Sequence, residues 1–156
     1  MVIANIAGMA VSEKEEDTIV TYSLGSCLGL ALYDKVNKVG GMLHAMLPDH
    51  LIVPNDINRC KFVDTGIAVL LNHLEKCGAV LSNLKADIAG CSHIMDSAGI
   101  FRIGERNLEM TKTLLQKFSI PIRSENVGGT KSRTIYLDIA TGTFVIDTMG
   151  QRRIID

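Results

Sequence analysis

The sequence lacks an excess of charge of either sign and any long hydrophobic run. Its 156 residues carry a formal net charge of −1, and no long run of Lys or Arg is present. These absences argue against the phosphate-neutralising face of a nucleic-acid-binding protein. No uncharged apolar stretch is long enough to cross a bilayer, and the first residues lack the positive region of a signal peptide. The sequence therefore predicts a cytoplasmic protein that does not insert into a membrane.

The four cysteines lack the paired spacing of a metal site. Cys27, Cys60, Cys77 and Cys91 form no C-x2-C pair. In a chain without export features, they are predicted to stay reduced rather than to form a disulfide framework. A zinc-type site built from Cys60, Cys77, Cys91 and His93 is the metal alternative, although two of these residues fall on an expected helix. We expect neither a metal nor an organic cofactor.

What is present is enough apolar content for a core. Hydrophobic residues make up 47% of the chain, which at this length suits one domain over residues 1–156. Apolar residues recur at helical spacing over 58–77, where Gly78 follows as a stop, and over 105–118, which Gly104 opens. The other apolar segments are short and bounded by turn residues. The expected strands cover residues 2–11, 18–22, 28–33, 39–47, 86–90, 120–126, 133–139, 143–148 and 153–155.

Many strands with only two helices predict an α+β protein rather than alternating βαβ units. The charged segment 12–17, the loop 48–58 and a polar turn at 96–99 are expected on the surface. The sequence contains no internal repeat, no heptad pattern and no low-complexity tract.

Chemistry is expected where a glycine-bearing turn carries a cysteine. Gly25 and Ser26 permit a sharp bend before Cys27, which exposes backbone N–H groups that stabilise a thiolate or an oxyanion. The strands on either side of the polar turn at 34–38 can pair as a hairpin. Such a hairpin would bring His44 beside Cys27, and a thiol nucleophile needs a basic partner of this kind.

Each candidate residue also fits a structural role. Cys27 is compatible with a small buried apolar residue, His44 with a hydrogen-bonded core histidine, and Thr21 with an ordinary strand residue. A cysteine nucleophile, a histidine base and a hydroxyl that orients the imidazole would together form an acyl-transfer site. Spacing alone does not choose between these interpretations.

Four short motifs follow one another along most of the chain: LGSC at 24–27, HAMLP at 44–48, IGERN at 103–107 and GGTKSR at 128–133. In this order they resemble the CheD family of chemoreceptor glutamine deamidases. The first two motifs are specific in combination, whereas the Gly-Gly turn alone would be weak. The chain departs from the usual family pattern at 90–92, where Gly-Cys-Ser replaces a Gly-Gly-Ala-type segment.

The resemblance implies hydrolysis of selected glutamine side-chain amides on methyl-accepting chemotaxis proteins. Cys27 matches the family nucleophile, His44 the general base and Thr21 the third catalytic residue, and the turn at Gly25 and Ser26 would hold the oxyanion. The implied route starts from a Cys27 thiolate paired with protonated His44 and passes through a thioester. The implied architecture is similar to that of the cytotoxic necrotizing factor deamidase toxins: a mixed, mostly antiparallel β-sandwich-like core with two helices on one side.

The resemblance also implies a complex with CheC-type chemotaxis phosphatases, which would occupy the deamidase site as a substrate mimic. A binding module that regulates such a phosphatase is therefore the alternative to an enzyme. The complete set of Cys27, His44 and Thr21 favours the enzyme.

Overall fold

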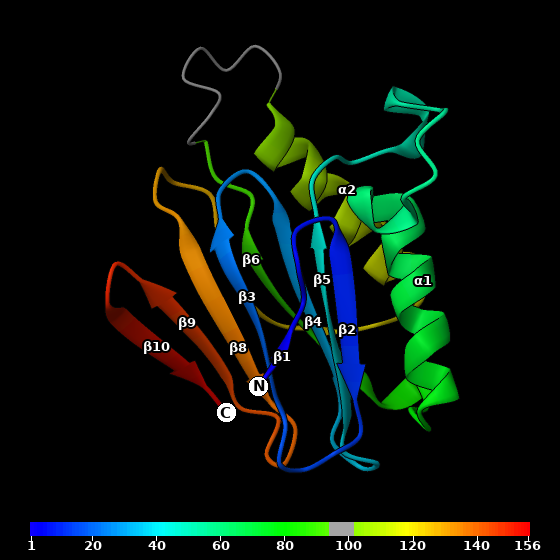
Figure 1. Ribbon diagram of the computed structural model, residues 1–156, viewed down its shortest axis with the longest axis vertical. Coiled ribbons are helices and arrows are strands. Elements are labelled where there is room, and N and C mark those ends of the chain that lie inside the picture. Colours follow the sequence, from blue (N-terminus) through cyan, green and yellow to red (C-terminus); the bar gives the residue numbers. More distant parts are fainter. Residues whose placement is uncertain (94–101) are drawn as a thin grey trace.

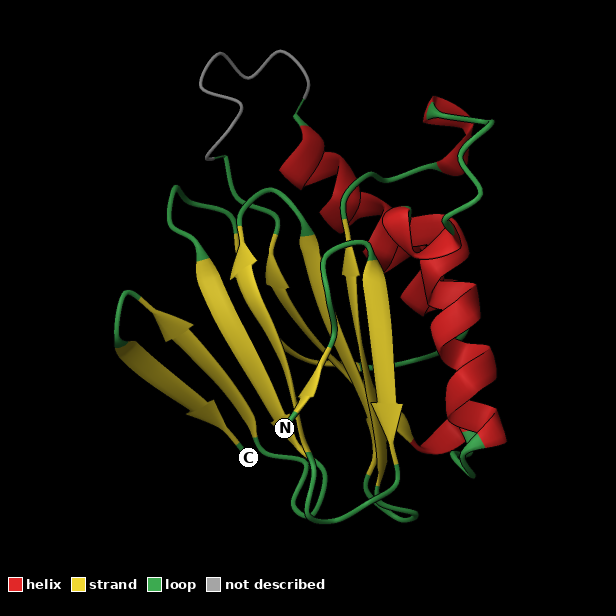
Figure 2. Ribbon diagram, viewed as in Figure 1, coloured by secondary structure: helices red, strands yellow, loops and turns green. Residues whose placement is uncertain are grey.

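The computed structural model describes residues 1–93 and 102–156, so the polar turn expected at 96–99 lies outside the described residues. Two β-sheets pack face to face around one apolar core, and two helices cover the free face of the second sheet (Figure 1, Figure 2). The predicted α+β class, with a sandwich-like core and helices on one side, is confirmed.

Each sheet has five strands, and most neighbours run antiparallel. The first sheet has the order β1-β3-β8-β9-β10, with β1 (Val2–Ile3), β3 (Thr18–Leu24), β8 (Arg133–Asp138), β9 (Phe144–Thr148) and β10 (Gln151–Ile155). The second has the order β2-β5-β4-β6-β7, with β2 (Gly8–Ser12), β5 (Val39–Ala45), β4 (Leu28–Asp34), β6 (Leu84–Gly90) and β7 (Ile122–Val127). The β1–β3 and β6–β7 pairs are parallel.

The helices are α1 (Val63–Lys76) and α2 (Ile103–Lys117), with short 3-10 turns η1 (His50–Ile52), η2 (Arg59–Lys61) and η3 (Leu81–Asn83). The predicted stop at Gly78 is confirmed by its φ of +99°. The predicted start of α1 at 58 is wrong, because the side chain of Asn58 caps η2 and Phe62 is extended before α1 begins. Neither of the two described helices is long and apolar enough to cross a membrane.

Strand β4 separates the two cores. Leu28, Leu30 and Leu32 pack in the cluster between the second sheet and the helices, whereas Ala31 and Tyr33 pack between the sheets. This alternation follows from the two-residue period of a strand. Every residue of β4 is buried, and the strand lies in the middle of the second sheet.

The single strand predicted over 2–11 is wrong. The segment forms two short strands, β1 and β2, that belong to different sheets. Between them Ala7 adopts a left-handed φ of +56°, and a Cβ on Gly8 would lie 2.9 Å from the carbonyl oxygen of Asn5. The tight turn carries the chain from one sheet to the other, and it leaves Ala4 packed in the core between the sheets.

The hairpin predicted from the two apolar runs is confirmed, because β4 pairs antiparallel with β5. The buried carboxylate of Asp34 accepts hydrogen bonds from the backbone N–H groups of Val36, Asn37 and Val80. Burial by itself would raise the pKa of Asp34, but these hydrogen bonds and those from the side-chain amides of Asn37 and Asn83 outweigh burial and lower it. Asp34 therefore fixes the end of the hairpin that lies away from Cys27.

We expect Asp34→Ala to lower the free energy of unfolding by roughly 2–4 kcal/mol, because several backbone donors lose their acceptor. Val36→Ala in the same turn is the matched control, since Val36 is exposed, and it should change stability by less than about 0.5 kcal/mol. Urea unfolding measures both variants. Equal effects would contradict the role given to Asp34.

Candidate active site

The turn between β3 and β4 carries Cys27, and its carbonyl groups are held from two sides. The carbonyl of Gly25 accepts from the N–H of Ser92 at 3.0 Å, and that of Cys27 accepts from the N–H of Cys91 at 2.8 Å. Both donors follow β6 directly. The turn is therefore tied to the end of the neighbouring strand.

The middle carbonyl of this turn, that of Ser26, accepts from the side-chain amide of Asn107 on α2 at 3.0 Å. The carbonyl groups of Gly25, Ser26 and Cys27 therefore all accept hydrogen bonds. No hydrogen bond among residues 1–93 and 102–156 uses the N–H of Gly25 or Ser26. Unengaged N–H groups beside a nucleophile are what an oxyanion hole requires.

His44 lies on β5, opposite Gly29 of β4. Cys27 lies two residues before Gly29, so it is a diagonal neighbour of His44 on the same side of the sheet. The side chain of Cys27 packs against the core between the sheets, and His44 is 2% exposed. The structure thus places Cys27 directly before β4, at the end of the predicted hairpin where His44 lies on β5.

Thr21, on β3 of the first sheet, reaches His44 across the core. Its Oγ1 lies 2.8 Å from Nδ1 of His44 and 2.6 Å from the carbonyl oxygen of Ala4. A threonine hydroxyl has one hydrogen and a carbonyl can only accept, so Thr21 donates to Ala4 and accepts from Nδ1–H of His44. The neutral ring therefore keeps Nε2 unprotonated. This nitrogen is buried and has no hydrogen-bond partner in the described part of the chain, so its lone pair is available to take a proton.

Proteins of similar sequence identify the family of this chain. A family model described as "CheD chemotactic sensory transduction" matches residues 46–148. A Clostridium tetani protein named probable chemoreceptor glutamine deamidase CheD is 44% identical over 140 residues, which cover 88% of this chain and 85% of that protein. The chain belongs to the CheD family.

A second CheD relative, from Desulforamulus reducens, has the same name and is 41% identical over 135 residues, which cover 85% of this chain and 81% of that protein. Among solved structures, a Neisseria meningitidis protein of the DUF152 family matches with a TM-score of 0.46 and 9% identity, over 83% of this chain and 64% of that chain. The CheD resemblance seen in the four motifs is confirmed. The likeness to the necrotizing factor toxins stays a prediction.

Burial sets the protonation of the two groups at this CheD site. Burial lowers the pKa of His44 to about 4. It also raises the pKa of the Cys27 thiol, an effect that the thiol's own backbone N–H partly offsets. At neutral pH the free protein therefore holds a neutral thiol and a neutral imidazole. Burial therefore does not favour the thiolate–imidazolium pair implied by the resemblance, and that pair stays a prediction.

Cys91 is a second thiol near the turn. It is buried in the cluster under the helices, and burial, followed by the charge of Cys27, raises its pKa to about 12. A thiol with so high a pKa is a poor nucleophile at neutral pH. Of these two thiols, Cys27 is the less buried.

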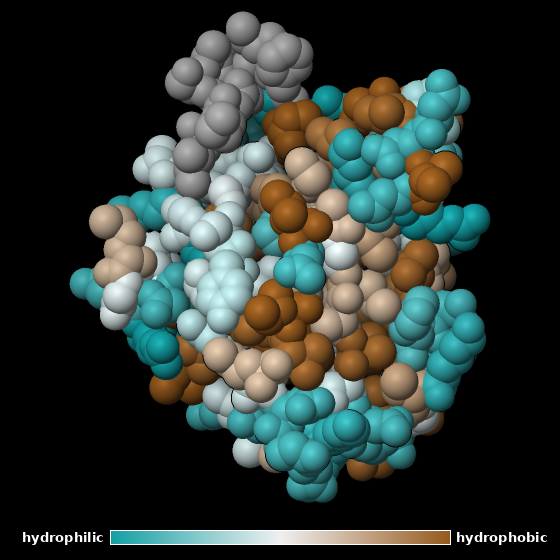
Figure 3. All heavy atoms as spheres, in the orientation of Figure 1, coloured by the Kyte–Doolittle hydropathy of each residue, from teal (hydrophilic) through white to brown (hydrophobic). Residues whose placement is uncertain are grey.

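A hollow of about 290 Å³ opens beside the imidazole. Figure 3 shows this face of the molecule, on which hydrophobic side chains gather over β1 and β2. Ile3, Ile6 and Tyr22 are exposed there and offer an apolar surface next to the site. The hollow is lined by Ile3, Ala4, Asn5, Ile6, Thr21, Tyr22, Ser23 and His44.

Arg133 explains the fourth CheD motif. Its guanidinium donates to the side-chain oxygen of Asn126 at 2.6 Å and to the carbonyl of Gly128 at 2.9 Å. A third, longer bond of 3.3 Å reaches the carbonyl of Gly90. A Cβ on Gly90 would lie 2.4 Å from the carbonyl oxygen of Cys27. Arg133 and Gly90 therefore shape the support of the turn, a role that no local sequence pattern indicated.

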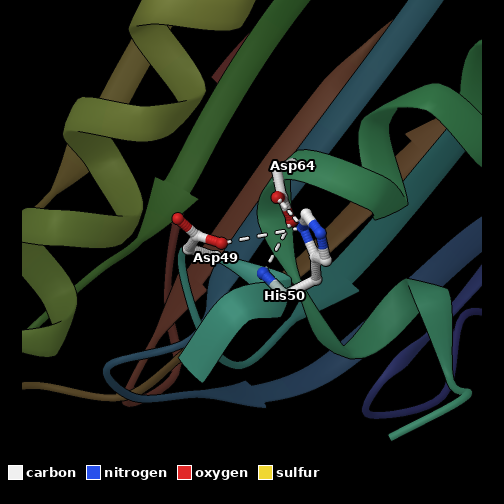
Figure 4. A group of neighbouring side chains, drawn as sticks. All are labelled: Asp49, His50 and Asp64. Atoms are coloured by element: carbon white, nitrogen blue, oxygen red, sulfur yellow. Dashed lines mark hydrogen bonds and ion pairs between the residues drawn. The ribbon is translucent and has the colours of Figure 1, made fainter. Parts of the chain in front are cut away.

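In the described residues, the one group of three or more side chains that could hold a metal is Asp49, His50 and Asp64 (Figure 4). Nδ1 of His50 lies 2.5 Å from a carboxylate oxygen of Asp64, and this hydrogen bond raises the pKa of the exposed His50. His50 therefore forms an ion pair with Asp64 when its ring is protonated. The alternative metal site around Cys60 and Cys77 is wrong, since these two residues lie at opposite ends of α1.

The lowered pKa of His44 makes stability depend on pH. The ring titrates near 6.5 when unfolded and at about 4 when folded, so between these values the unfolded chain binds the extra proton. The free energy of unfolding should therefore fall as pH drops through this window, and the contribution is fully present above about pH 6.5.

Urea unfolding of the wild type and of His44→Gln, at about pH 7 and about pH 4.5, measures this contribution. The wild type should lose more stability than the variant on acidification. Equal losses would show that His44 is not held as a buried neutral ring.

Proposed function

We propose that this chain hydrolyses the side-chain amides of selected glutamines on methyl-accepting chemotaxis proteins, in the cytoplasm. Its CheD relatives are named chemoreceptor glutamine deamidases. The observation that carries the proposal is the free Nε2 of His44 next to the turn that bears Cys27. A thiol, a base and oxyanion donors suffice for amide hydrolysis.

In the first half-reaction, the sulfur of Cys27 attacks the carboxamide carbon while Nε2 of His44 takes the thiol proton. Both groups are neutral at rest, so the proton moves as the new bond forms. The N–H groups of Gly25 and Ser26 donate to the oxygen that becomes negative. His44 then gives its proton to the departing nitrogen, and ammonia leaves a thioester on Cys27.

In the second half-reaction, Nε2 of His44 takes a proton from water as the water oxygen attacks the thioester carbon. The bond to sulfur breaks, and His44 returns the proton to Cys27. One water is consumed, one ammonia is released, and glutamate remains on the substrate.

Thr21 keeps His44 in the correct tautomer through both steps. When Nε2 takes a proton, the ring becomes positive, and the acceptor oxygen of Thr21 stabilises the charge through Nδ1–H. The carbonyl of Ala4 holds the Thr21 hydrogen away from Nδ1. The N-terminal segment thus takes part in positioning the base.

Cys27→Ala should abolish deamidation and leave the melting temperature nearly unchanged, because the side chain is half-buried and small. Cys77→Ala, at the end of α1, is the control and should keep full activity. Intact-mass analysis of a receptor cytoplasmic fragment detects the mass gain of each amide converted to acid. Residual turnover in Cys27→Ala would remove Cys27 from the mechanism.

The two substitutions of Thr21 separate a catalytic from a structural role. Thr21→Ser keeps the hydroxyl and should retain much of the activity, whereas Thr21→Val should lose on the order of 10²-fold or more in kcat. If Thr21 had only a structural role in the strand, Thr21→Val would leave the activity nearly unchanged and Thr21→Ser would lower it more. Steady-state rates are read beside the melting temperatures of both variants; full activity in Thr21→Val would leave a dyad of Cys27 and His44.

A CheC-type phosphatase is the second partner that the family resemblance implies. The proposal places its binding at the same end of the molecule, where the hollow beside His44 has exposed Ile3 and Ile6 as apolar walls. Binding of such a phosphatase would then compete with the receptor. Deamidation rates with increasing phosphatase concentration test this competition.

A further inference from the structure

Asn107 is one of two fully buried polar residues on α2, the other being Thr111. It lies in the second turn of α2 and is 0% exposed. Its side-chain nitrogen donates to the carbonyl of Ser26 at 3.0 Å and to that of Met46 at 3.1 Å. One amide group therefore contacts two segments that are distant in the sequence.

The two segments are those that carry the thiol and the imidazole. Ser26 directly precedes Cys27, and Met46 lies two residues after His44. The pairing of β4 with β5 ends at Leu28 and Ala45. Beyond that pair, the carbonyl groups of Ser26 and Met46 both approach Asn107, and two acceptors cannot bond to each other. An NH2 group, with two hydrogens, joins them.

The two contacts decide the orientation of the Asn107 side-chain amide, and this orientation leaves one polar atom unpaired. Both partners are carbonyl oxygens, so the nitrogen must point at them, and Oδ1 is left buried with no hydrogen-bond partner among the described residues. Leaving a buried acceptor unpaired is unfavourable. A leucine of similar shape would remove this unpaired oxygen, but it would leave the carbonyl groups of Ser26 and Met46 without the donor that joins them.

Gly104 allows the start of α2 to lie close to the segment that follows β6. A Cβ at this position would lie 2.5 Å from the carbonyl oxygens of both Cys91 and Ser92. The N–H groups of the same two residues hold the catalytic turn. The close approach brings the side chain of Asn107 within reach of the turn before Cys27.

We propose that Asn107 is a positioning residue that sets the placement of the Cys27 thiol relative to His44, by clamping the turn before Cys27 to the chain after His44. The assignment of Cys27 and His44 rests on the proposed deamidase function. Asn107 is fully buried and touches neither reacting group, so it acts on the rate of the chemical step and not on the binding of the receptor.

Asn107→Leu and Asn107→Ser remove the clamp, the second with room for solvent so that folding is less disturbed. Thr111→Val is the matched control, because Thr111 is equally buried on the same helix but bonds only within α2. Steady-state deamidation of a receptor cytoplasmic fragment gives kcat and KM, and thermal melting gives the stability of each variant.

We expect the Asn107 variants to lose about 30- to 100-fold in kcat, since a small displacement of reacting groups has an effect of this order. KM should stay within about twofold, and Thr111→Val should keep kcat within about threefold even at a comparable loss of melting temperature. A folded Asn107→Ser variant with wild-type kcat, or a kcat loss in Thr111→Val that matches that of the Asn107 variants, would overturn the proposal.

A second measurement does not depend on the substrate. The rate of Cys27 alkylation by iodoacetamide at neutral pH reports proton transfer from the thiol to His44, and His44→Gln gives the rate without that transfer. The Asn107 variants should be slowed toward the His44→Gln rate, whereas Thr111→Val should match the wild type. If the wild type failed to deamidate any receptor, the proposed function would fall, while the alkylation rates would still support or overturn the clamp.

Discussion

The hydrogen bond between Thr21 and His44 is the interaction on which the site depends. It crosses from β3 in the first sheet to β5 in the second, so it forms only if the two sheets pack at the correct separation. Its direction is decided by a third element, because the carbonyl of Ala4 takes the only hydrogen of the hydroxyl. The apolar core between the sheets therefore does more than stabilise the fold, because it also sets the tautomer of His44, the base in the proposed reaction.

The unsatisfied polar groups of the molecule gather at the same place. In residues 1–93 and 102–156, the buried side-chain polar atoms without a partner are Nε2 of His44, Oγ of Ser92 and Oδ1 of Asn107. Ser92 and Asn107 hold the turn before Cys27, and His44 lies beside it. Each unpaired group costs about 1–3 kcal/mol. Such costs are tolerated where function requires the arrangement. The three unpaired atoms lie at one end of the second sheet.

Burial also lowers the reactivity of the Cys27 thiol, because it raises the pKa of that thiol. The apolar surroundings that lower the pKa of His44 and raise that of Cys27 keep both groups neutral at rest. A neutral thiol reacts slowly with oxidants and electrophiles. In the proposed reaction, the sulfur becomes nucleophilic as its proton passes to His44 while the new bond forms.

Local patterns in the sequence determined much of this protein. The apolar runs of β4 and β5, the polar turn between them and the helical spacing of α1 each involve residues close in the chain. The two runs and the turn predict the hairpin at whose end Cys27 and His44 lie. The break of the first strand, the tautomer set by Ala4 and the clamp at Asn107 were decided only by the tertiary structure. Asn107 and Ser26 are 81 residues apart, and neither residue's neighbours in sequence carry a sign of the contact. Such long-range hydrogen bonds depend on how the sheets and α2 pack, which periodicity and turn chemistry do not encode.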